Sequence, residues 1–236
     1  MKKFVKFLLS KTNWRLKKVY KNKSYTNVKP RLELINSIYS CNGIIHMGGH
    51  RGGEAPVYDW FNKKAIWIEA NPEIILDLKE NISQFINQDV FQALLSNVDD
   101  KIEDFKISSN DGASSSIFSF GEFSKIHENI KMVKSIKLMT KKLDTIIQNE
   151  KIDLNEYNFW TIDLQGSEMI ALEGAKESIK KCKFIYVEIS KEDVYKGGAR
   201  WKDLNDFLVE RGFSLAWEPK EVHTDVLYIK SEINLS

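Results

Sequence analysis

Residues 44–54 have the sequence IIHMGGHRGGE, and residues 65–71 have the sequence AIWIEAN. The apolar residues before Gly48 predict a buried strand, and the glycines let the backbone bend tightly and approach a ligand where a Cβ would not fit. Glu69 ends the second apolar run about 20 residues after Gly48, the spacing of a carboxylate that binds a nucleoside ribose. The two segments predict a strand, a glycine turn, a helix and a second strand around a nucleoside cofactor.

The spacing of the glycines indicates which nucleoside cofactor the turn could bind. A dinucleotide site has Gly-x-Gly-x-x-Gly at the start of a helix, so that the pyrophosphate lies at the helix N-terminus. Here three residues separate Gly48 and Gly52, with further glycines at positions 49 and 53, so that pattern is not matched. A Gly-x-x-x-Gly turn suits S-adenosylmethionine, which has no phosphates and whose amino-acid end passes across the turn. The alternative is that the turn is ordinary chain geometry.

The second half of the chain strengthens the cofactor hypothesis. Residues 157–175, YNFWTIDLQGSEMIALEGA, again predict a strand, a turn and a helix. Here the chain resembles the FkbM family of S-adenosylmethionine-dependent methyltransferases, in which a strand ends in an aspartate, a small turn holds Gly and Glu, and the next helix closes on Leu-x-Gly-Ala. The residues that carry this resemblance, in the family's order, are Glu69, Ala93-Leu94-Leu95-Ser96, Ser114-Ser115-Ser116, Leu143-Asp144-Thr145-Ile146, Asp163, Gly166, Glu168 and Leu172-Glu173-Gly174-Ala175.

Strand and helix patterns alternate along the chain. This predicts an α/β, Rossmann-like fold: a mostly parallel sheet with helices on both faces and ligands at the carboxyl ends of the strands. The resemblance implies seven strands, the last antiparallel. Expected strands are 43–47, 65–69, 89–95, 159–164, 184–189, 214–217 and 226–230; expected helices are 54–62, 72–85, 167–179 and 201–211. An insertion at about 99–140 predicts two further strands at 102–107 and 132–138.

The resemblance and the expected sheet edge name candidate cofactor residues. Glu69 is expected to accept hydrogen bonds from both ribose hydroxyls. Asp163 ends a central strand, so it is expected to contact the methionine ammonium or to act as general base on the acceptor hydroxyl. Their alternatives are structural, a helix cap or surface carboxylate for Glu69 and a helix N-cap for Asp163. The other expected cofactor-binding residues are Gly48, His50, Gly52, Ala70, Asn71, Ala93, Leu94 and Ser96.

The acceptor side is less defined by the sequence. Ser115, in the polar segment 110–116, and the carboxylates Glu168 and Glu188 are the candidate substrate-binding residues. A solvent-exposed turn is the alternative for the segment, and structural hydrogen bonding is the alternative for the two glutamates.

Two histidines depart from the family pattern. Many members have an acidic residue at the position of His46 and an asparagine at that of His50, so the polar contact from position 46 cannot be carried over. With Glu54 nearby, the pair suggests a metal, but metal sites usually show tighter ligand spacing on a regular element, and no metal is expected.

Composition favours one soluble enzyme domain at residues 41–236. The formal net charge is +2, from 35 basic and 33 acidic residues, which offers no global electrostatic case for nucleic acid. The two cysteines, Cys41 and Cys182, suit a reducing compartment, so the expected location is the cytoplasm. No apolar run approaches the about 20 residues that span a bilayer.

Residues 1–40 form a segment of different character. Basic residues precede the first acidic one, Glu33, and alternate with apolar residues. Lys6 interrupts the apolar region that a signal peptide would need, so a basic amphipathic helix is the better interpretation. It either packs on the domain, or lies on an anionic membrane face such as the inner one, or contacts an anionic glycan carrier.

The expected function is S-adenosylmethionine-dependent O-methyl transfer to a hydroxyl of a sugar or glycan-like acceptor, with the acceptor class implied by the resemblance alone. Two alternatives remain: a non-catalytic cofactor-binding module, and transfer to a non-sugar small molecule. A nucleic-acid base methyltransferase would have an Asn/Asp-Pro-Pro-aromatic turn where this chain has Asp163-Leu164-Gln165-Gly166. A nicotinamide oxidoreductase would have the phosphate-binding glycine pattern that is missing here.

Overall fold

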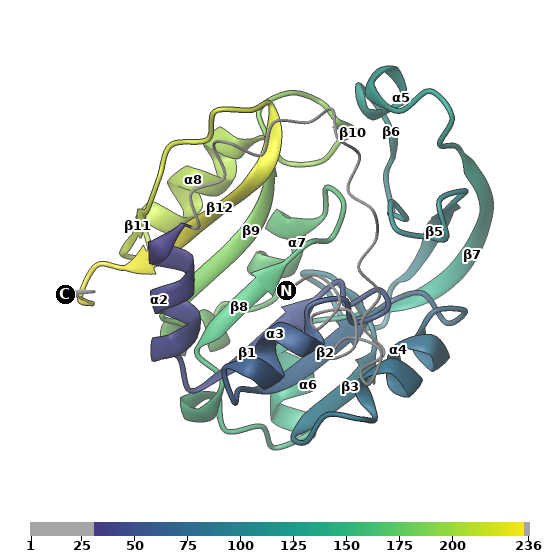
Figure 1. The fold of residues 1–236 in the computed structure, drawn as a ribbon. Helices are drawn as coiled ribbons and strands as arrows, with labels where there is room; N and C mark the ends of the chain where they lie inside the picture. Colours follow the sequence, from purple (N-terminus) through teal and green to yellow (C-terminus); the bar gives the residue numbers. More distant parts are fainter. Residues whose placement is uncertain (1–30, 234–236) are drawn as a thin grey trace, which may run out of the picture. The chain divides into compact units, whose positions relative to one another are not determined.

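The computed structural model describes residues 31–233 and contains a central seven-stranded sheet (Figure 1). The strand order is β11-β12-β9-β8-β1-β2-β3. Strands β1, β2, β3, β8 and β9 run parallel, whereas β12 is antiparallel to both β9 and β11. The sheet strands are β1 (Gly43–Met47), β2 (Lys64–Glu69), β3 (Gln88–Gln92), β8 (Phe159–Ile162), β9 (Phe184–Ser190), β11 (Phe213–Leu215) and β12 (His223–Lys230). The Rossmann-like fold with an antiparallel last strand is therefore confirmed.

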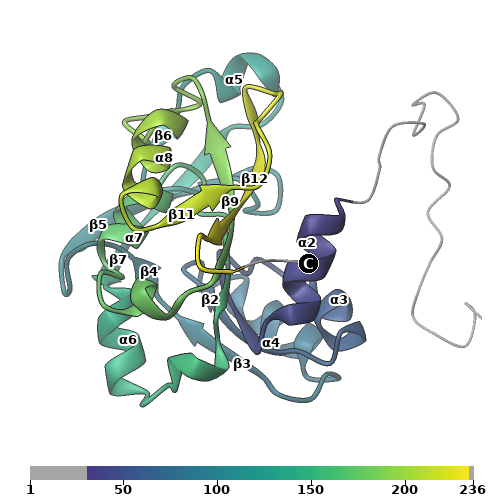
Figure 2. The ribbon, with the colours of Figure 1, turned by 90° about the vertical axis from the view of Figure 1, so that its left-hand side faces the viewer.

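Helices cover both faces of this sheet (Figures 1 and 2). Apolar side chains of α2, α3 and α4 form one core layer with alternate residues of the strands, and those of α6, α7 and α8 form the other. All five residues of β1 are buried, because a central parallel strand is covered on both sides. The helices are α2 (Leu32–Ser40), α3 (Ala55–Trp60), α4 (Ile75–Ile82), α5 (Phe123–Ile126), α6 (Leu143–Asn149), α7 (Glu168–Glu173) and α8 (Trp201–Val209).

The helices form where apolar residues recur at helical spacing. In α8 the buried residues are Leu204, Phe207 and Leu208, and in α4 they are Ile75, Leu78 and Ile82. Gly212, with a φ of 77°, follows the last turn of α8 and suits the left-handed conformation that ends many helices. Each helix thus presents one apolar stripe to the sheet.

The predicted strand 89–95 was wrong as one element. β3 ends at Gln92 and stays in the main sheet, while β4 (Leu94–Leu95) pairs with β7 (Met132–Lys141) of a second sheet in the order β4-β7-β5. The backbone N–H of Ala93 still donates to the Glu69 carbonyl at 3.0 Å, so the chain leaves the sheet just beyond that point. Leu94 packs with Phe105 and Ile107 of β5, whereas Leu95 packs in the core of the main sheet.

The predicted helix 167–179 was also too long. α7 ends at Glu173, and Gly174 follows as its C-cap. Gly174 packs against the backbone of Ser96, where a Cβ would collide with the Ser96 carbonyl oxygen. The Asp144 carboxylate then accepts a hydrogen bond from the Ser178 N–H at 2.8 Å, and a 3₁₀ turn (Ser178–Lys181) follows.

The insertion contains the two predicted strands and more. β5 (Ile102–Ser108) and β7 pair antiparallel, and β6 (Ser119–Phe120) pairs with β10 (Tyr195–Lys196). Most of the predicted basic segment, residues 1–30, lies outside the described residues; its last part, α2, belongs to the compact unit that begins at Leu32. Within residues 31–233, no helix has the length and apolar character that crossing a bilayer requires.

Candidate functional site

A cavity of about 270 Å³ lies at the carboxyl ends of β1, β2 and β8. This is where the strand directions of an open parallel sheet leave a crevice. Its volume is near the lower end of ligand-binding cavities, roughly 300–1,000 Å³. The described residues that line it include neither Lys nor Arg; they are His46, Gly48, Gly49, His50, Gly53, Glu54, Ile68, Glu69, Ala70, Ala93, Leu94, Leu95, Phe105, Gly112, Ala113, Ser115, Asp163, Leu164, Gln165 and Ser167.

The glycine turn forms one wall of this cavity, and its glycines have different roles. Gly48 has a φ of 88°, and a Cβ there would collide with the backbone carbonyl of Asp163. At Gly52 a Cβ would lie 2.9 Å from side-chain atoms of both Leu78 and Ile82. Only at Gly53, among these three, would it meet nothing within 4 Å. At both Gly48 and Gly52 the missing side chain makes room for close packing of the protein itself. Gly48 also lines the cavity, whereas Gly52 does not, and contact of either glycine with the cofactor stays a prediction.

Glu69 lies at the end of β2 and is buried. Its Oε2 accepts the backbone N–H of His50 at 2.8 Å, and its Oε1 accepts that of Asn71 at 2.7 Å. Burial raises the pKa of this carboxyl, and the two backbone donors act in the opposite direction. A carboxylate has about four lone-pair sites, so each oxygen retains acceptor capacity toward the cavity. Glu69 is therefore neither a surface carboxylate nor a simple helix cap.

The remaining predicted cofactor residues separate into two groups. His50, Ala70, Ala93 and Leu94 line the cavity together with Glu69. Asn71 and Ser96 do not line it, although both are buried. The Asn71 side chain accepts the N–H of Glu73 at 3.0 Å, so its role in the structure is to shape the loop after β2.

The polar segment 110–116 closes over one side of the cavity. Ser115 lines it, and its hydroxyl accepts the backbone N–H of Ser108 at 3.1 Å. The ring Nε2 of His50 lies 3.0 Å from the Asp111 carbonyl, which joins this segment to the glycine turn. The predicted position of Ser115 beside the cofactor site is thus compatible with the geometry, and its contact with substrate stays a prediction.

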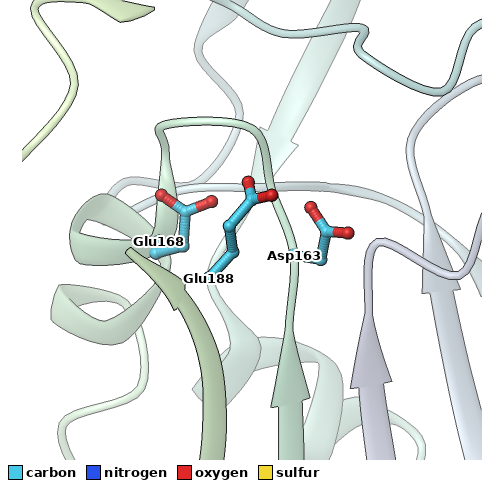
Figure 3. A group of neighbouring side chains, drawn as sticks. All are labelled: Asp163, Glu168 and Glu188. Atoms are coloured by element: carbon cyan, nitrogen blue, oxygen red, sulfur yellow. The ribbon is translucent and has the colours of Figure 1, made fainter. Parts of the chain in front are cut away.

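Three carboxyl groups converge beyond the end of β8 (Figure 3). Oxygens of Asp163, Glu168 and Glu188 all lie within 4.8 Å of one another. Asp163 follows β8, Glu168 begins α7 and Glu188 is in β9, so the turn between β8 and α7 brings them together. The N-cap position of α7 is Ser167, so Asp163 is not the helix cap.

Asp163 is the member of this group that lines the cavity. The side chain of Asp163 is exposed to the cavity on one side. On its other sides, protein groups surround the carboxyl group. Burial and the charge of Glu188 raise the pKa of its carboxyl well above the ordinary value of 3.8. The Gln165 amide donates to Asp163 and also to Glu188, the latter at 3.0 Å. A carboxylate whose pKa is raised in this way is a stronger base than an ordinary aspartate, which suits it to accept a proton.

The other two carboxyls lie behind Asp163 and do not line this cavity. Glu168 accepts the backbone N–H groups of Leu164 and Gly166 at 2.9 and 3.0 Å. Burial raises its pKa to about 7. Glu188 lies 3.1 Å from the Nε2 of His223, and burial raises its pKa well above the usual range. Both glutamates therefore shape the turn that carries Asp163, and their predicted contacts with substrate stay predictions.

Within residues 31–233, neither His46 of β1 nor His50 of the glycine turn belongs to a group of ligand atoms close enough to share an ion. Among the described residues, the group whose ligand atoms lie close enough together is Asp163, Glu168 and Glu188. Protein donors already bind each of these carboxylates. His46 is buried, with its Nδ1 2.9 Å from the Tyr58 hydroxyl.

A second cavity, of about 240 Å³, was not predicted. It shares His46, Glu54 and Asp163 with the first and extends along the sheet face beneath α2 and α3. Paired positions on β1, β8 and β9 place His46, Thr161 and Tyr186 in one row across the sheet. The signal in the sequence was a polar residue within each of three otherwise mostly apolar strands. The described lining residues are Leu34, Ile38, His46, Glu54, Val57, Tyr58, Phe159, Thr161, Ile162, Asp163, Tyr186 and Asp225.

The glycine turn allows a direct test. Gly48→Val is expected to destabilise the protein by several kcal/mol, because the side chain meets backbone and the φ is positive. Gly53→Val is expected to leave the thermal midpoint nearly unchanged, because a Cβ there meets open space, and to weaken ligand binding in the cavity that it lines. Thermal unfolding and calorimetry of both variants would measure this. A well-folded Gly48→Val protein would contradict the packing role.

Comparison with known proteins shows what the chain is similar to. The model of the methyltransferase FkbM domain matches residues 46–215. The 2-O-methyltransferase NoeI of Sinorhizobium fredii (strain NBRC 101917 / NGR234) is 28% identical over 196 residues, which cover 78% of this chain and 77% of that protein. Among solved structures, a SAM-dependent methyltransferase from Aquifex aeolicus gives a TM-score of 0.46 at 10% identity, covering 84% of this chain and 88% of the other. Magnesium protoporphyrin IX methyltransferase from Synechocystis, with bound SAM, gives 0.45 at 7% identity, covering 84% and 74%.

Proposed function

The chain belongs to the FkbM methyltransferase family, and from this premise we propose that it methylates a hydroxyl of a sugar or glycan-like acceptor. It is an S-adenosylmethionine-dependent methyltransferase. The assignment to oxygen draws support from NoeI, which is named as a 2-O-methyltransferase. The assignment to a sugar is what the resemblance to the family implies. The observation that carries it is the position of Asp163, which lines both cavities at the carboxyl end of β8.

The first cavity fits S-adenosylmethionine. None of its described lining residues is Lys or Arg, which suits a cofactor without phosphates and not a nicotinamide dinucleotide. Glu69 retains acceptor sites for ribose hydroxyls, and Leu94 and Phe105 provide apolar surface for the adenine ring. Asp163 provides negative charge for the cationic end of the cofactor. When bound, S-adenosylmethionine supplies a methyl group whose bond to sulfur breaks as its bond to the acceptor oxygen forms.

The protein then has three tasks in the proposed reaction. Glu69 holds the cofactor ribose, while the backbone N–H groups of His50 and Asn71 hold Glu69 in place. Asp163 accepts the proton of the acceptor hydroxyl, helped by a pKa that burial and Glu188 raise. Gln165 fixes the orientation of Asp163 by donating to it. Alignment contributes much of the rate, because an in-line displacement depends on geometry.

Transfer of labelled methyl groups tests the proposal. The wild-type protein is incubated with S-adenosylmethionine carrying a labelled methyl group and with a panel of glycosides, phenols and small alcohols. Mass analysis is expected to find a gain of one methyl group on a sugar hydroxyl. A gain on the phenols or alcohols alone would refute the sugar assignment, and cofactor binding without any gain would indicate a binding module.

We further propose that the basic segment at residues 1–30 controls location and not chemistry. Deleting residues 1–23 is expected to weaken co-sedimentation with phosphatidylserine vesicles while turnover on a soluble acceptor stays within about twofold. Each Lys or Arg near such a surface is worth about 1 kcal/mol, and salt screens that attraction. The intact chain at raised salt is the control and should resemble the deletion. Loss of folding on deletion would instead favour packing of the segment on the domain.

A further inference from the structure

The second cavity adjoins the first one at a shared wall. His46, Glu54 and Asp163 line both cavities. Of these, Asp163 is the group to which the proposed function assigns the acceptor proton. A compound in the second cavity would therefore lie across this wall from the cofactor, on the side where α2 and α3 cover the sheet.

We infer, on the basis of the proposed function, that the second cavity binds the methyl acceptor, and that this acceptor is an uncharged hydroxyl compound with an apolar face and not an anion. Three kinds of observation support this inference: the hydrogen-bonding state of His46, the charge of the lining residues and the apolar character of the remaining wall.

His46 is a neutral hydrogen-bonding group on the shared wall. Its ring stacks on Trp67 with the centroids 4.4 Å apart, and burial lowers its pKa to about 3. Nδ1 lies 2.9 Å from the Tyr58 hydroxyl, which lies 3.1 Å from the hydroxyl of Thr161. Within the described residues Nε2 forms no hydrogen bond, although the residue is 4% exposed. This nitrogen is a polar atom that a ligand hydroxyl would satisfy, whereas the low pKa makes His46 a poor proton acceptor.

The acidic side chains that line the second cavity all carry carboxyl groups. Glu54, Asp163 and Asp225 line it, and none of its described lining residues is Lys or Arg. Glu188, on the neighbouring strand, is paired with Asp225. An acceptor with a carboxylate or phosphate would lie close to like charges in a partly desolvated site, which is unfavourable.

The rest of the wall is apolar. Leu34 and Ile38 of α2, Val57 of α3 and Phe159 of β8 lie along it. Such a surface suits the CH face of a sugar ring or an apolar substituent on it, while the hydroxyls meet the polar shared wall. The cavity therefore selects a compound with one apolar and one polar side.

Binding of matched glycosides tests the inference. The p-nitrophenyl β-glycosides of glucose, N-acetylglucosamine and glucuronic acid are titrated by calorimetry into the full chain saturated with S-adenosylhomocysteine. The two neutral glycosides are expected to bind at least about tenfold more tightly than the glucuronide. Equal or tighter binding of the glucuronide, or no binding of either neutral glycoside, would overturn the inference.

Two matched variants locate the site. Val57 is 43% exposed and lines the cavity, so Val57→Trp is expected to fill it without unfolding the protein and to weaken neutral glycoside binding at least about tenfold. Val209 is 52% exposed on α8, which covers the opposite face, so Val209→Trp should bind as the wild type does. Unchanged binding in Val57→Trp would overturn the inference. Glycoside binding without methyl gain from S-adenosylmethionine would refute the proposed function instead.

Discussion

Asp163→Asn is expected to lower turnover by roughly 10²–10⁴-fold, the usual contribution of a positioned general base. Asparagine keeps the shape and can still accept the hydrogen bond from Gln165, so only the charge and the basicity are lost. Because Asp163 also faces the cofactor cavity, a smaller loss of cofactor affinity is expected as well. Single-turnover kinetics measures the first effect and calorimetry the second.

The pH dependence gives an independent measure of the same role. Asp163 must be ionised to accept a proton, and its pKa is raised well above 3.8 by burial and by Glu188. The ratio kcat/KM is therefore expected to rise with pH through that raised pKa, since this ratio reports groups of the free enzyme. The control is Glu177→Gln, which changes an exposed carboxylate paired with Lys180. Wild-type turnover and affinity in Asp163→Asn would show that the base lies elsewhere.

Glu69→Ala is expected to weaken S-adenosylmethionine binding by about 10²–10⁴-fold. Two charge-assisted hydrogen bonds to the ribose are worth about 1.5–3 kcal/mol each, and every 1.4 kcal/mol is a factor of ten. The variant also leaves the backbone N–H groups of His50 and Asn71 without their carboxylate, so some loss of thermal stability should accompany the binding defect. Calorimetry at a temperature where the variant is fully folded separates the two effects.

Asp77→Ala is the matched control for Glu69. The Asp77 carboxylate of α4 forms an ion pair with Arg51 of the glycine turn, with 3.0 Å between Oδ2 and Nε. Asp77 does not line the cavity. Its removal should leave cofactor affinity within about twofold, because an exposed ion pair contributes little. Unchanged affinity in Glu69→Ala, or tight binding of a nicotinamide dinucleotide by the wild type, would contradict the assignment of the first cavity.

Much of the fold follows from local patterns in the sequence. Apolar runs predicted the strands around Ile45 and Ile66, and helical spacing predicted α4 and α8, because these signals depend on neighbouring residues only. The glycine turn after β1 and the acidic residue at the end of β2 were placed in the same way. Family membership and the cofactor were also predicted correctly, on motifs that occur in a defined order along the chain.

Tertiary packing determined the features that local sequence patterns could not predict, such as the sheet to which a strand belongs and the surroundings of a glycine. Leu94 and Leu95 belong to a second sheet, in which they pair with β7. Since β7 is more than 40 residues away in the sequence, a local pattern cannot predict that pairing. Whether a glycine faces ligand or protein also depends on distant segments: Gly48 meets the end of β8, and Gly52 meets α4. No periodicity around either glycine contains that information.

Some features of the site were likewise predictable from the sequence, and others depend on tertiary packing. Glu69 and Asp163 were identifiable from the sequence because each ends a strand, and strand ends share one edge of a parallel sheet. The grouping of Asp163 with Glu168 and Glu188, the neutral state of His46 and the second cavity arise only when β9, α2 and α3 pack beside β1 and β8. Burial and the charge of neighbouring groups set a pKa and the shape of a cavity, and both are properties of the assembled tertiary structure.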